Sequence, residues 1–352
     1  MQTWQLLKGN PALFQRYFVK EYMIKAIRKF FEGKSYHELE SPILASALPQ
    51  ERYLDVLKTE ISLKGGDTKT AYLIPSTETY NKKILAAGIG NHFVITKVFR
   101  GLEDISPNHS PEFTMLEWYD MDRTYEDLMK DCEVMFEYIK KYIDAKFERE
   151  YSPIVKYGEN EIDITAPWPR ISVPEALEKH ANIELKSIQT LEQIKRVASA
   201  KGYSVSNDDD WETLFELIFL NEVEPNLPTE KPCFVYDYPK MLCPLTKNKA
   251  SNPLVCEKVE LYVAGKELGN GYTELRDGDE QDKRFQEERA ARIALGKEPV
   301  AYDYELIKAL KAGIPPVAGM GMGLDRLAMI FANARNISEI NFFPASEFFE
   351  PS

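Results

Sequence analysis

The sequence of 352 residues lacks a long apolar run, since no segment approaches the ~20 consecutive apolar residues that a membrane-spanning helix needs. Its first ten residues, MQTWQLLKGN, have neither the basic start nor the apolar centre of a secretion signal. These two absences predict a cytoplasmic protein with no membrane partner.

Cysteine is scarce, and its spacing excludes a CxxC metal knuckle. Without a secretion signal, we expect a reducing compartment in which all four cysteines remain buried or half-buried thiols. The four are Cys132, Cys233, Cys243 and Cys256.

Basic residues are fewer than acidic ones, 44 against 56, which gives a net charge of −12. Extensive binding of tRNA or DNA depends on phosphate neutralisation by Lys and Arg, so this balance argues against it without excluding a local basic patch. The sequence also has no internal repeat, low-complexity tract or linker. With 44% hydrophobic residues, we expect residues 1–352 to form one compact domain.

Hydrophobic periodicity predicts a helix over 13–31, following Asn10-Pro11. It also predicts a charged amphipathic helix over 123–150, which we expect to form a solvated outer layer. A glycine turn at 65–66 predicts a hairpin between 53–63 and 71–74, and a helix is expected to begin near Thr77 with Glu78 in its first turn. Residues 151–229 mix strand and helix signals and are interpreted as a peripheral insertion. The acidic run 207–210 lacks the Gly and Glu spacing of a calcium loop.

Two alternating runs, HFVITKVF (92–99) and EFTMLEWY (112–119), predict antiparallel strands joined by a long loop. The alternation puts Glu117 and Tyr119 on one strand face with two apolar residues, and Arg100 follows the first strand. Such charges are costly to bury unless something there needs them. The alternative is an ordinary hairpin in which Arg100 and Glu117 pair with each other.

Two further patterns suggest ligand contacts. Residues 258–274 predict a hairpin that brings Glu260 and Glu267 together, and two facing carboxylates repel unless a cation lies between them, or unless both simply point into water. In that hairpin Gly271 is expected to let the backbone approach a ligand. Glycines 319, 321 and 323 alternate along a strand before Arg326, which leaves a bare sheet face for a flat base.

The order FR (99–100), E, H, PEF (111–113) and LE (116–117) followed by Tyr119 resembles motif 2 of the class II aminoacyl-tRNA synthetases of the lysine, aspartate and asparagine subgroup. Residues 36–44 resemble motif 1, and 319–326 with INFFP downstream resemble motif 3. The resemblance implies an α+β fold, an antiparallel sheet of about six strands flanked by helices, and a homodimer formed through motif 1.

The same resemblance implies ATP and Mg²⁺ as ligands and gives each residue a role. The expected catalytic residues are Arg100 and Arg326, and Glu260 and Glu267 are the expected ligands of Mg²⁺. The residues expected to bind ATP are Arg100, Glu103, His109, Phe113, Glu260, Glu267, Gly323 and Arg326. Those expected to bind the amino acid are Glu78, Arg100, Glu117, Tyr119, Asn270, Tyr272 and Glu274. The loop before His109 is one residue longer than the family pattern, and Asn108 stands where a basic residue is common.

The implied reaction is ATP-dependent activation of lysine or β-lysine, since Glu117 and Glu274 suit a cationic side chain and oppose an asparagine-synthetase-like pocket. No anticodon-binding domain is expected before motif 1, and the run 223–239 resembles a short branch that ligates β-lysine to elongation factor P. We therefore predict elongation factor P as the acceptor, with weak or absent tRNA binding. Gly321, where that branch has Ala and lysine synthetases have Gly, leaves α- and β-lysine open. A minimal tRNA-charging enzyme and a non-catalytic binding module are the alternatives.

Overall fold

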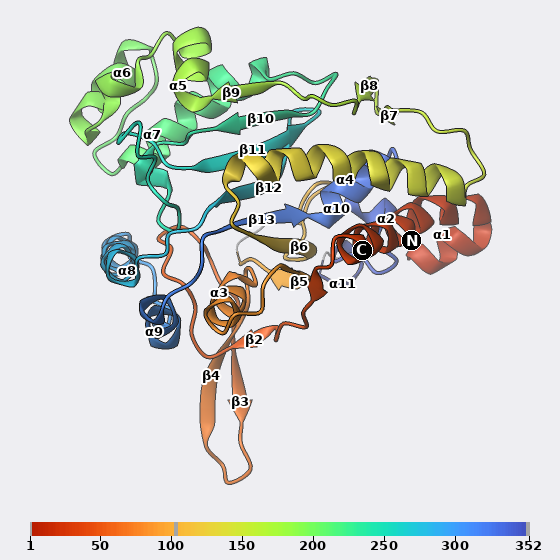
Figure 1. Ribbon diagram of the computed structural model, residues 1–352, viewed down its shortest axis with the longest axis horizontal. Helices are drawn as coiled ribbons and strands as arrows, with labels where there is room; N and C mark the ends of the chain where they lie inside the picture. Colours follow the sequence, from red (N-terminus) through yellow and green to blue (C-terminus); the bar gives the residue numbers. More distant parts are fainter. Residues whose placement is uncertain (1, 102–104, 350–352) are drawn as a thin grey trace.

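The computed structural model describes residues 2–101 and 105–349, and an eight-stranded sheet runs through this part of the chain (Figure 1). Its pairing is antiparallel except at the two edges, where the strands are parallel. In spatial order the strands are β1 (His37–Glu38), β5 (His92–Phe99), β6 (Glu112–Met121), β13 (Val317–Gly323), β12 (Lys266–Thr273), β11 (Lys258–Val263), β10 (Cys233–Tyr236) and β9 (Arg170–Ser172). The sheet has two strands more than expected, while the predicted α+β architecture is confirmed.

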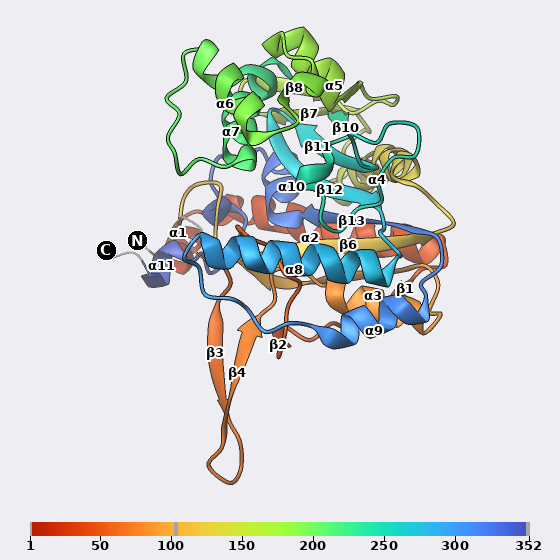
Figure 2. The same cartoon turned by 90° about the vertical axis from the view of Figure 1, so that its left-hand side faces the viewer.

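Helices flank both faces of this sheet. The main hydrophobic core lies under α2 (Phe14–Gly33), α4 (Tyr125–Lys146) and α10 (Leu324–Phe331), which pack on one face. A smaller core beside the other face involves α3 (Glu78–Ala86), α8 (Gly278–Ala294) and α9 (Tyr304–Ala312). Figure 2 shows α8 and α9 side by side along that flank.

The helix α4 corrects the expectation of a solvated outer layer. It lies against α2 and against β11, β12 and β13, and ten of its residues are buried. One face of α4 carries an apolar stripe that includes Leu128, Cys132 and Phe136, whose side chains are all 0 to 1% exposed. The helix is therefore a central part of the core, and only its outer face meets water.

Strand alternation decides which side chains reach each face. In β6, Leu116 and Trp118 point into the main core, while Glu117 and Tyr119 point to the opposite side. The predicted hairpin of β5 and β6 is confirmed, with Phe99 opposite Glu112 and His92 opposite Tyr119.

The glycines of β12 and β13 divide between the two faces. Gly319, Gly321 and Gly323 lie on the side away from the main core, as their alternation predicts. The prediction for Gly271 is wrong, because a Cβ there would lie 2.9 Å from Met320 Cγ and 3.0 Å from Leu128 Cδ1. Gly271 therefore allows close packing of core side chains, including one from α4, and not the approach of a ligand.

Residues 151–229 form a layer at one edge of the sheet, to which they contribute the strand β9, as Figure 1 shows in green. They share a second core with the segment that follows them, and β9 joins them to β10. The elements are β7 (Ile154–Tyr157), β8 (Asn160–Asp163), α5 (Val173–Ala176), η2 (Leu177–Ala181), η3 (Leu185–Ile188), α6 (Leu191–Ala200), α7 (Trp211–Ile218), η4 (Phe219–Val223) and η5 (Glu224–Asn226). In the acidic run 207–210, Asp210 caps α7 by accepting from the backbone N–H of Thr213 at 2.9 Å.

The amino-terminal region contains two α-helices, whereas one helix beginning after Asn10-Pro11 was expected. A helix α1 (Thr3–Gly9) precedes Asn10, the Asn10-Pro11 pair opens only the short turn η1 (Pro11–Leu13), and α2 begins at Phe14. The predicted glycine hairpin is confirmed as β3 (Lys58–Ser62) and β4 (Thr68–Leu73), which projects from the body in Figure 1. Of these two strands, β4 also pairs with β2 (Leu44–Ala45). The carboxy-terminal turns are η7 (Ile337–Glu339) and α11 (Ser346–Phe349).

The expectation of four free thiols is wrong for one pair. The segment after β10 includes η6 (Lys240–Leu242) and folds back on itself. Two isolated antiparallel β-bridges hold this turn, one between Pro239 and Val255 and one between Asn248 and Cys256. This turn brings the Cα atoms of Cys243 and Cys256 to 6.7 Å, and the two residues form a disulfide. Cys132 and Cys233 are buried free cysteines, as expected.

Across residues 2–101 and 105–349, no helix combines the length and apolar character needed to cross a membrane.

Candidate active site

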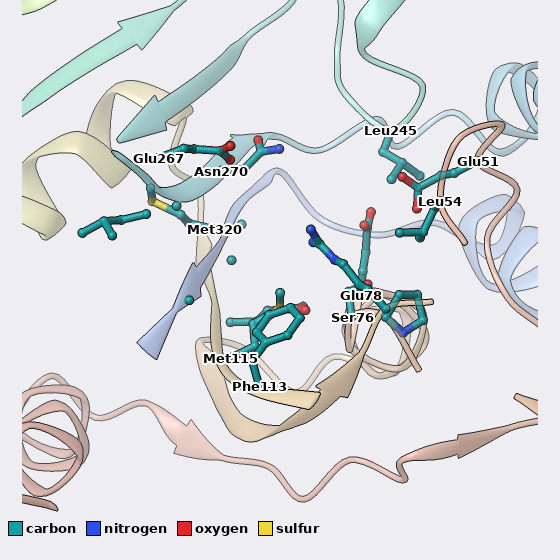
Figure 3. Close-up of a pocket in the computed structure, with 18 of the residues that line it drawn as sticks. Glu51, Leu54, Ser76, Glu78, Phe113, Met115, Leu245, Glu267, Asn270 and Met320 are labelled. Atoms are coloured by element: carbon teal, nitrogen blue, oxygen red, sulfur yellow. The ribbon is translucent and has the colours of Figure 1, made fainter. Parts of the chain in front are cut away.

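A cavity of about 700 Å³ opens on the sheet face that carries Glu117 and Tyr119. Its floor is formed by β6, β12 and β13, and its walls by the start of α3, the segment 51–55 and the segment 242–246. Figure 3 shows Glu267 and Asn270 on one side of this space and Glu78 and Ser76 on the other, with Phe113 and Met115 below it. A volume of this size suits a small-molecule site.

The first end of the cavity contains two arginines from distant parts of the chain. Arg100 follows β5, and its guanidinium lies 5.4 Å from the ring centre of Phe113 on β6. Its buried Nε has no hydrogen-bond partner among the described residues. The alternative of a simple pair between Arg100 and Glu117 does not occur, because Glu117 is bound by other groups. Arg100 is therefore available to an anionic ligand.

Arg326, on the first turn of α10, reaches the same region. Its guanidinium donates to the carbonyl oxygen of Glu267 at 2.9 Å and lies 2.6 Å from His109 Nε2. The neighbouring Asp325 accepts from the backbone N–H of Thr114 and pairs with Lys20 of α2. This buried ion pair fixes α10 against β6, and thereby the position of Arg326 relative to Phe113.

The long loop after Arg100 is described only in part. Glu103, one of the predicted ATP contacts, lies outside the described residues. His109 and Asn108 both line the cavity, and Asn108 Oδ1 accepts from Lys266 at 3.1 Å. A basic side chain thus reaches this position from β12, although the loop itself carries Asn there.

Glu117 lies at the other end of the cavity and is held by α3. Its Oε1 accepts from the backbone N–H of Thr77 at 2.7 Å, and its Oε2 accepts from Asn81 Nδ2 at 3.2 Å and from the Tyr119 hydroxyl at 3.4 Å. Burial raises the pKa of Glu117 to about 7, partly opposed by the bond from Thr77. This carboxylate therefore gains from any further cation that enters the cavity.

Glu78 and Glu274 lie beside Glu117, and Lys82 lies beneath them. The Lys82 ammonium is 2.7 Å from Glu274 Oε2 and also pairs with Glu78, and it lies 5.7 Å from the ring centre of Tyr272. These contacts are ion pairs by distance, since the atoms involved make no hydrogen bond of good geometry among the described residues. The atoms are Lys82 Nζ, Glu78 Oε1 and Glu274 Oε2. Burial raises the pKa of Glu274 to about 8, against the opposing effect of Lys82.

Glu260 and Glu267 lie near enough for Glu260 to raise the pKa of Glu267, and Glu260 already pairs with a cation. Lys258 Nζ is 2.9 Å from Glu260 Oε1, while Glu260 Oε2 accepts from the hydroxyls of Tyr238 and Tyr262. Glu267 is open to the cavity, and its pKa is raised, first by its enclosure and then by Glu260. The repulsion expected between the two acids is therefore only partly relieved by Lys258.

The donor chemistry of this pair fits Mg²⁺. In residues 2–101 and 105–349 no group of three His, Cys, Asp or Glu side chains is arranged to hold a metal alone. Mg²⁺ commonly uses one or two carboxylates together with phosphate oxygens and water, so two carboxylates suffice when a nucleotide supplies the rest. Glu267 offers the open oxygens, and Glu260 would share its charge with Lys258.

The cavity thus brings together every predicted site residue that the structure describes, except that Glu260 lies behind its wall. Asn270, Tyr272 and Gly323 also line it. Sequence reasoning missed four polar residues that shape it: Glu51, Asn81, Lys82 and Lys258. Only Lys82 left a local signal, since it stands one helical turn after Glu78, a spacing that favours an ion pair.

Comparison with known proteins gives the family. Residues 5–347 match the family model described as tRNA synthetases class II (D, K and N). The chain is 31% identical over 341 residues to a lysine–tRNA ligase of Moorella thermoacetica, covering 95% of this chain and 66% of the relative. It is 32% identical over 345 residues to one of Legionella pneumophila (strain Paris), with 96% and 66% covered.

A lysine–tRNA ligase 2 of Methanosarcina acetivorans is 35% identical over 347 residues, with 95% of this chain and 63% of the relative covered. The chain therefore spans slightly less than two thirds of the length of these curated relatives. The family model covers nearly all of this chain. The chain belongs to the family of class II tRNA synthetases (D, K and N).

Proposed function

We propose that the protein activates lysine or β-lysine with ATP, forming an aminoacyl adenylate and pyrophosphate. The observation that supports this proposal is the division of charge in one cavity, with Arg100 and Arg326 at one end and three buried carboxylates at the other. An anionic triphosphate and the carboxylate of an amino acid suit the first end. A cationic side chain suits the second, because its binding relieves the repulsion among the acids.

The chemistry requires positioning and charge stabilisation, and no protein nucleophile. The substrate carboxylate attacks the α-phosphorus, the bond to the bridging oxygen breaks, and pyrophosphate leaves. Arg100 binds the α-phosphate and the substrate carboxylate, so the two reactants meet at one guanidinium. Phe113 and Arg326 enclose the adenine, and His109 holds Arg326 from the loop side. Positive charge fixed in advance at this point stabilises the negative charge that develops during transfer.

Mg²⁺ would be held by Glu267 and Glu260 together with the nucleotide phosphates. When bound, it would neutralise phosphate charge and stabilise the leaving pyrophosphate. Lys258 keeps Glu260 in place and supplies part of that positive charge from the protein.

We further propose that the acceptor of the activated amino acid is a lysine side chain of elongation factor P. The net charge of −12 favours a small protein docking surface over extensive tRNA contact, and the run 223–239 resembles the ligase branch. The acceptor amine must be neutral to attack, and the segment 106–110 at the cavity mouth is the proposed docking point.

The second candidate is aminoacylation of tRNA, which the names of the relatives favour, since each of those described is a lysine–tRNA ligase. Both candidates share the adenylate and differ only in the acceptor.

We also propose that two copies associate through the motif 1 region. Exposed apolar side chains gather where α1, α2 and the carboxy-terminal turns meet: Trp4, Phe18, Phe343, Phe348 and Phe349 are between 37 and 77% exposed. Contacts of Phe342 with Phe14 and Tyr17 join these segments into one surface. Light scattering should give twice the monomer mass of 40.5 kDa.

The decisive experiment is ATP–pyrophosphate exchange with a panel of amino acids. Lysine or β-lysine should support exchange, whereas norleucine, which lacks the second ammonium, and aspartate should not. Exchange with aspartate, or with norleucine as well as with lysine, would overturn the proposed activity. Label transfer to purified elongation factor P and to total tRNA then separates the two acceptors, and charging of tRNA alone would favour the second candidate.

A further inference from the structure

The acidic end of the cavity contains a cation that belongs to the protein. Lys82 is 0% exposed, and the carboxylates around it, Glu78, Glu117 and Glu274, are at most 7% exposed. Lys82 does not line the cavity itself, whereas all three acids do. Its ammonium therefore lies behind the acids, and a substrate would meet them from the cavity side.

We propose that Lys82 is a specificity-determining positioning residue: it neutralises one of three buried carboxylates, so that the pocket is complementary to a substrate carrying two ammonium groups. This inference rests on the proposed activation of a diamino acid and assigns the charge selection of that site to Lys82.

The argument begins with the count of charges. When all three carboxylates are ionised, they and the one ammonium leave two negative charges at this end of the cavity. Lysine and β-lysine each bring two ammonium groups, while their carboxylate is directed to Arg100. An amino acid with a single ammonium leaves one buried carboxylate unpaired, which is strongly unfavourable in a region of low dielectric constant.

The tyrosines and the histidine around the acids do not change this count. Tyr119 and Tyr272 are neutral, because burial raises the pKa of both hydroxyls. His92, stacked on Tyr119, is also neutral near pH 7, because burial lowers its pKa. Glu51 also lines the cavity, and burial together with the nearby Glu78 raises its pKa to about 7, so it adds at most a partial negative charge near pH 7.

Lys82 itself stays charged. Burial alone would lower its pKa, but Glu274 and Glu78 more than offset that effect, so the pKa is raised. The same pairing opposes the rise in the pKa of Glu274. Lys82 therefore makes Glu274 easier to ionise than burial alone would allow.

Helix α3 also fixes the geometry of the three acids. Glu78, Asn81 and Lys82 lie on one side of its first two turns, and the backbone N–H of Thr77 reaches Glu117. Asn81 Nδ2 also donates to Thr77 Oγ1 at 2.8 Å, which closes this network within the helix. A change at Lys82 therefore acts on substrate binding through Glu78 and Glu274, and not through ATP.

The test compares Lys82→Met with Lys83→Met. Lys83 is the next residue of α3, but its ammonium points away from the acids and pairs with Asp303 at 2.7 Å. Both variants lose one positive charge from the same helix. Exchange kinetics for lysine and for ATP are measured from pH 6 to about 8.5, where the substrate ε-amine remains protonated.

Lys82→Met should raise KM for lysine at least tenfold and leave KM for ATP within twofold. Removing a cation next to carboxylates raises their pKa by about 1 unit or more, so the pH at which kcat/KM for lysine is half-maximal should move upward. Lys83→Met should match the wild type. A purely structural role would lower kcat/KM at every pH without moving that midpoint, and such a result would overturn the inference.

A double variant covers the case in which Lys82→Met does not fold. Lys82→Met with Glu274→Gln removes one charge of each sign and again leaves two carboxylates. It should be more stable to denaturant than Lys82→Met, because it has one buried carboxylate fewer without a cation. Its pH midpoint should return toward the wild type, even though kcat/KM falls with the loss of Glu274. A double variant whose midpoint stays with that of Lys82→Met would refute the charge count.

The outcomes separate the inference from the proposed function. If the wild type exchanges with no diamino acid, the proposed function fails. If it exchanges with lysine and Lys82→Met keeps both the wild-type KM and the wild-type midpoint, only the inference about Lys82 fails.

Discussion

Replacing Gly319 with alanine should damage the amino-acid end of the cavity, whereas the same change at Gly321 should not. Both glycines lie on β13, two residues apart, and face the same cavity. A Cβ on Gly319 would lie 2.6 Å from Tyr119 Cε1 and 2.7 Å from Glu274 Oε1. A Cβ on Gly321 would meet nothing closer than 3.7 Å, which is an ordinary contact.

The magnitude follows from the overlap. Tyr119 is 3% and Glu274 1% exposed, so neither can move into water to make room. Overpacking of this kind costs about 1–3 kcal/mol. If that cost falls on the contacts to the substrate side chain, kcat/KM for lysine falls roughly 5- to 150-fold.

The assay is ATP–pyrophosphate exchange at varied lysine and varied ATP, combined with urea denaturation of both variants. Gly319→Ala should raise KM for lysine more than KM for ATP, and Gly321→Ala should fold with nearly wild-type stability. Equal lysine kinetics in the two variants would refute the placement of Tyr119 and Glu274 around the substrate side chain.

Three other changes test separate parts of the site. Glu267→Gln should abolish exchange while leaving the fold intact, because it removes the open carboxylate proposed for Mg²⁺; robust exchange would contradict that role. Arg326→Ala should raise KM for ATP roughly 2- to 30-fold, since a cation–π contact alone contributes about 0.5–2 kcal/mol; unchanged ATP affinity would exclude Arg326 from the nucleotide site. Lys20→Met should lower the free energy of unfolding by about 3–5 kcal/mol, because it leaves Asp325 buried without its cation. The pKa of Asp325 is lowered in the folded protein, because Lys20 and the bond from Thr114 outweigh burial. The stabilisation is therefore present above the unfolded pKa of about 3.9 and is lost as pH falls further, so urea midpoints of the wild type and Lys20→Met should converge in acid.

The strands that carry the site were predictable because their signal is local. Alternation in 112–119 places Glu117 and Tyr119 on one face from the sequence alone, and the structure confirms it. The alternating glycines of β13 are equally explicit, since a missing side chain at every second residue leaves one face bare. The sequence was less clear about which face of the sheet each residue of β12 occupies. Gly271 faces the main core, whereas we expected it to face the ligand.

The role of α4 was misjudged for a different reason. Its charged residues are numerous enough to suggest a solvated helix, but an apolar stripe of ordinary width is sufficient to bury one face. The number of charges on a helix says little about what lies on its other side, and the partners of α4, which are α2 and three later strands, lie far away in sequence.

The internal cations were the part of the site that the motifs could not give. Read alone, the motif acids imply five negative charges in two groups, one around Glu274 and one at Glu260 and Glu267. Each group has its own buried lysine, Lys82 or Lys258, so the charge left for ligands is two in the first group and one in the second. Lys82 and Glu274 are 192 residues apart, and only the fold brings them together. A pocket's preference for a cation is therefore set by the difference between its acids and the lysines beneath them, and a change of one buried lysine alters that preference without touching any residue of the motifs.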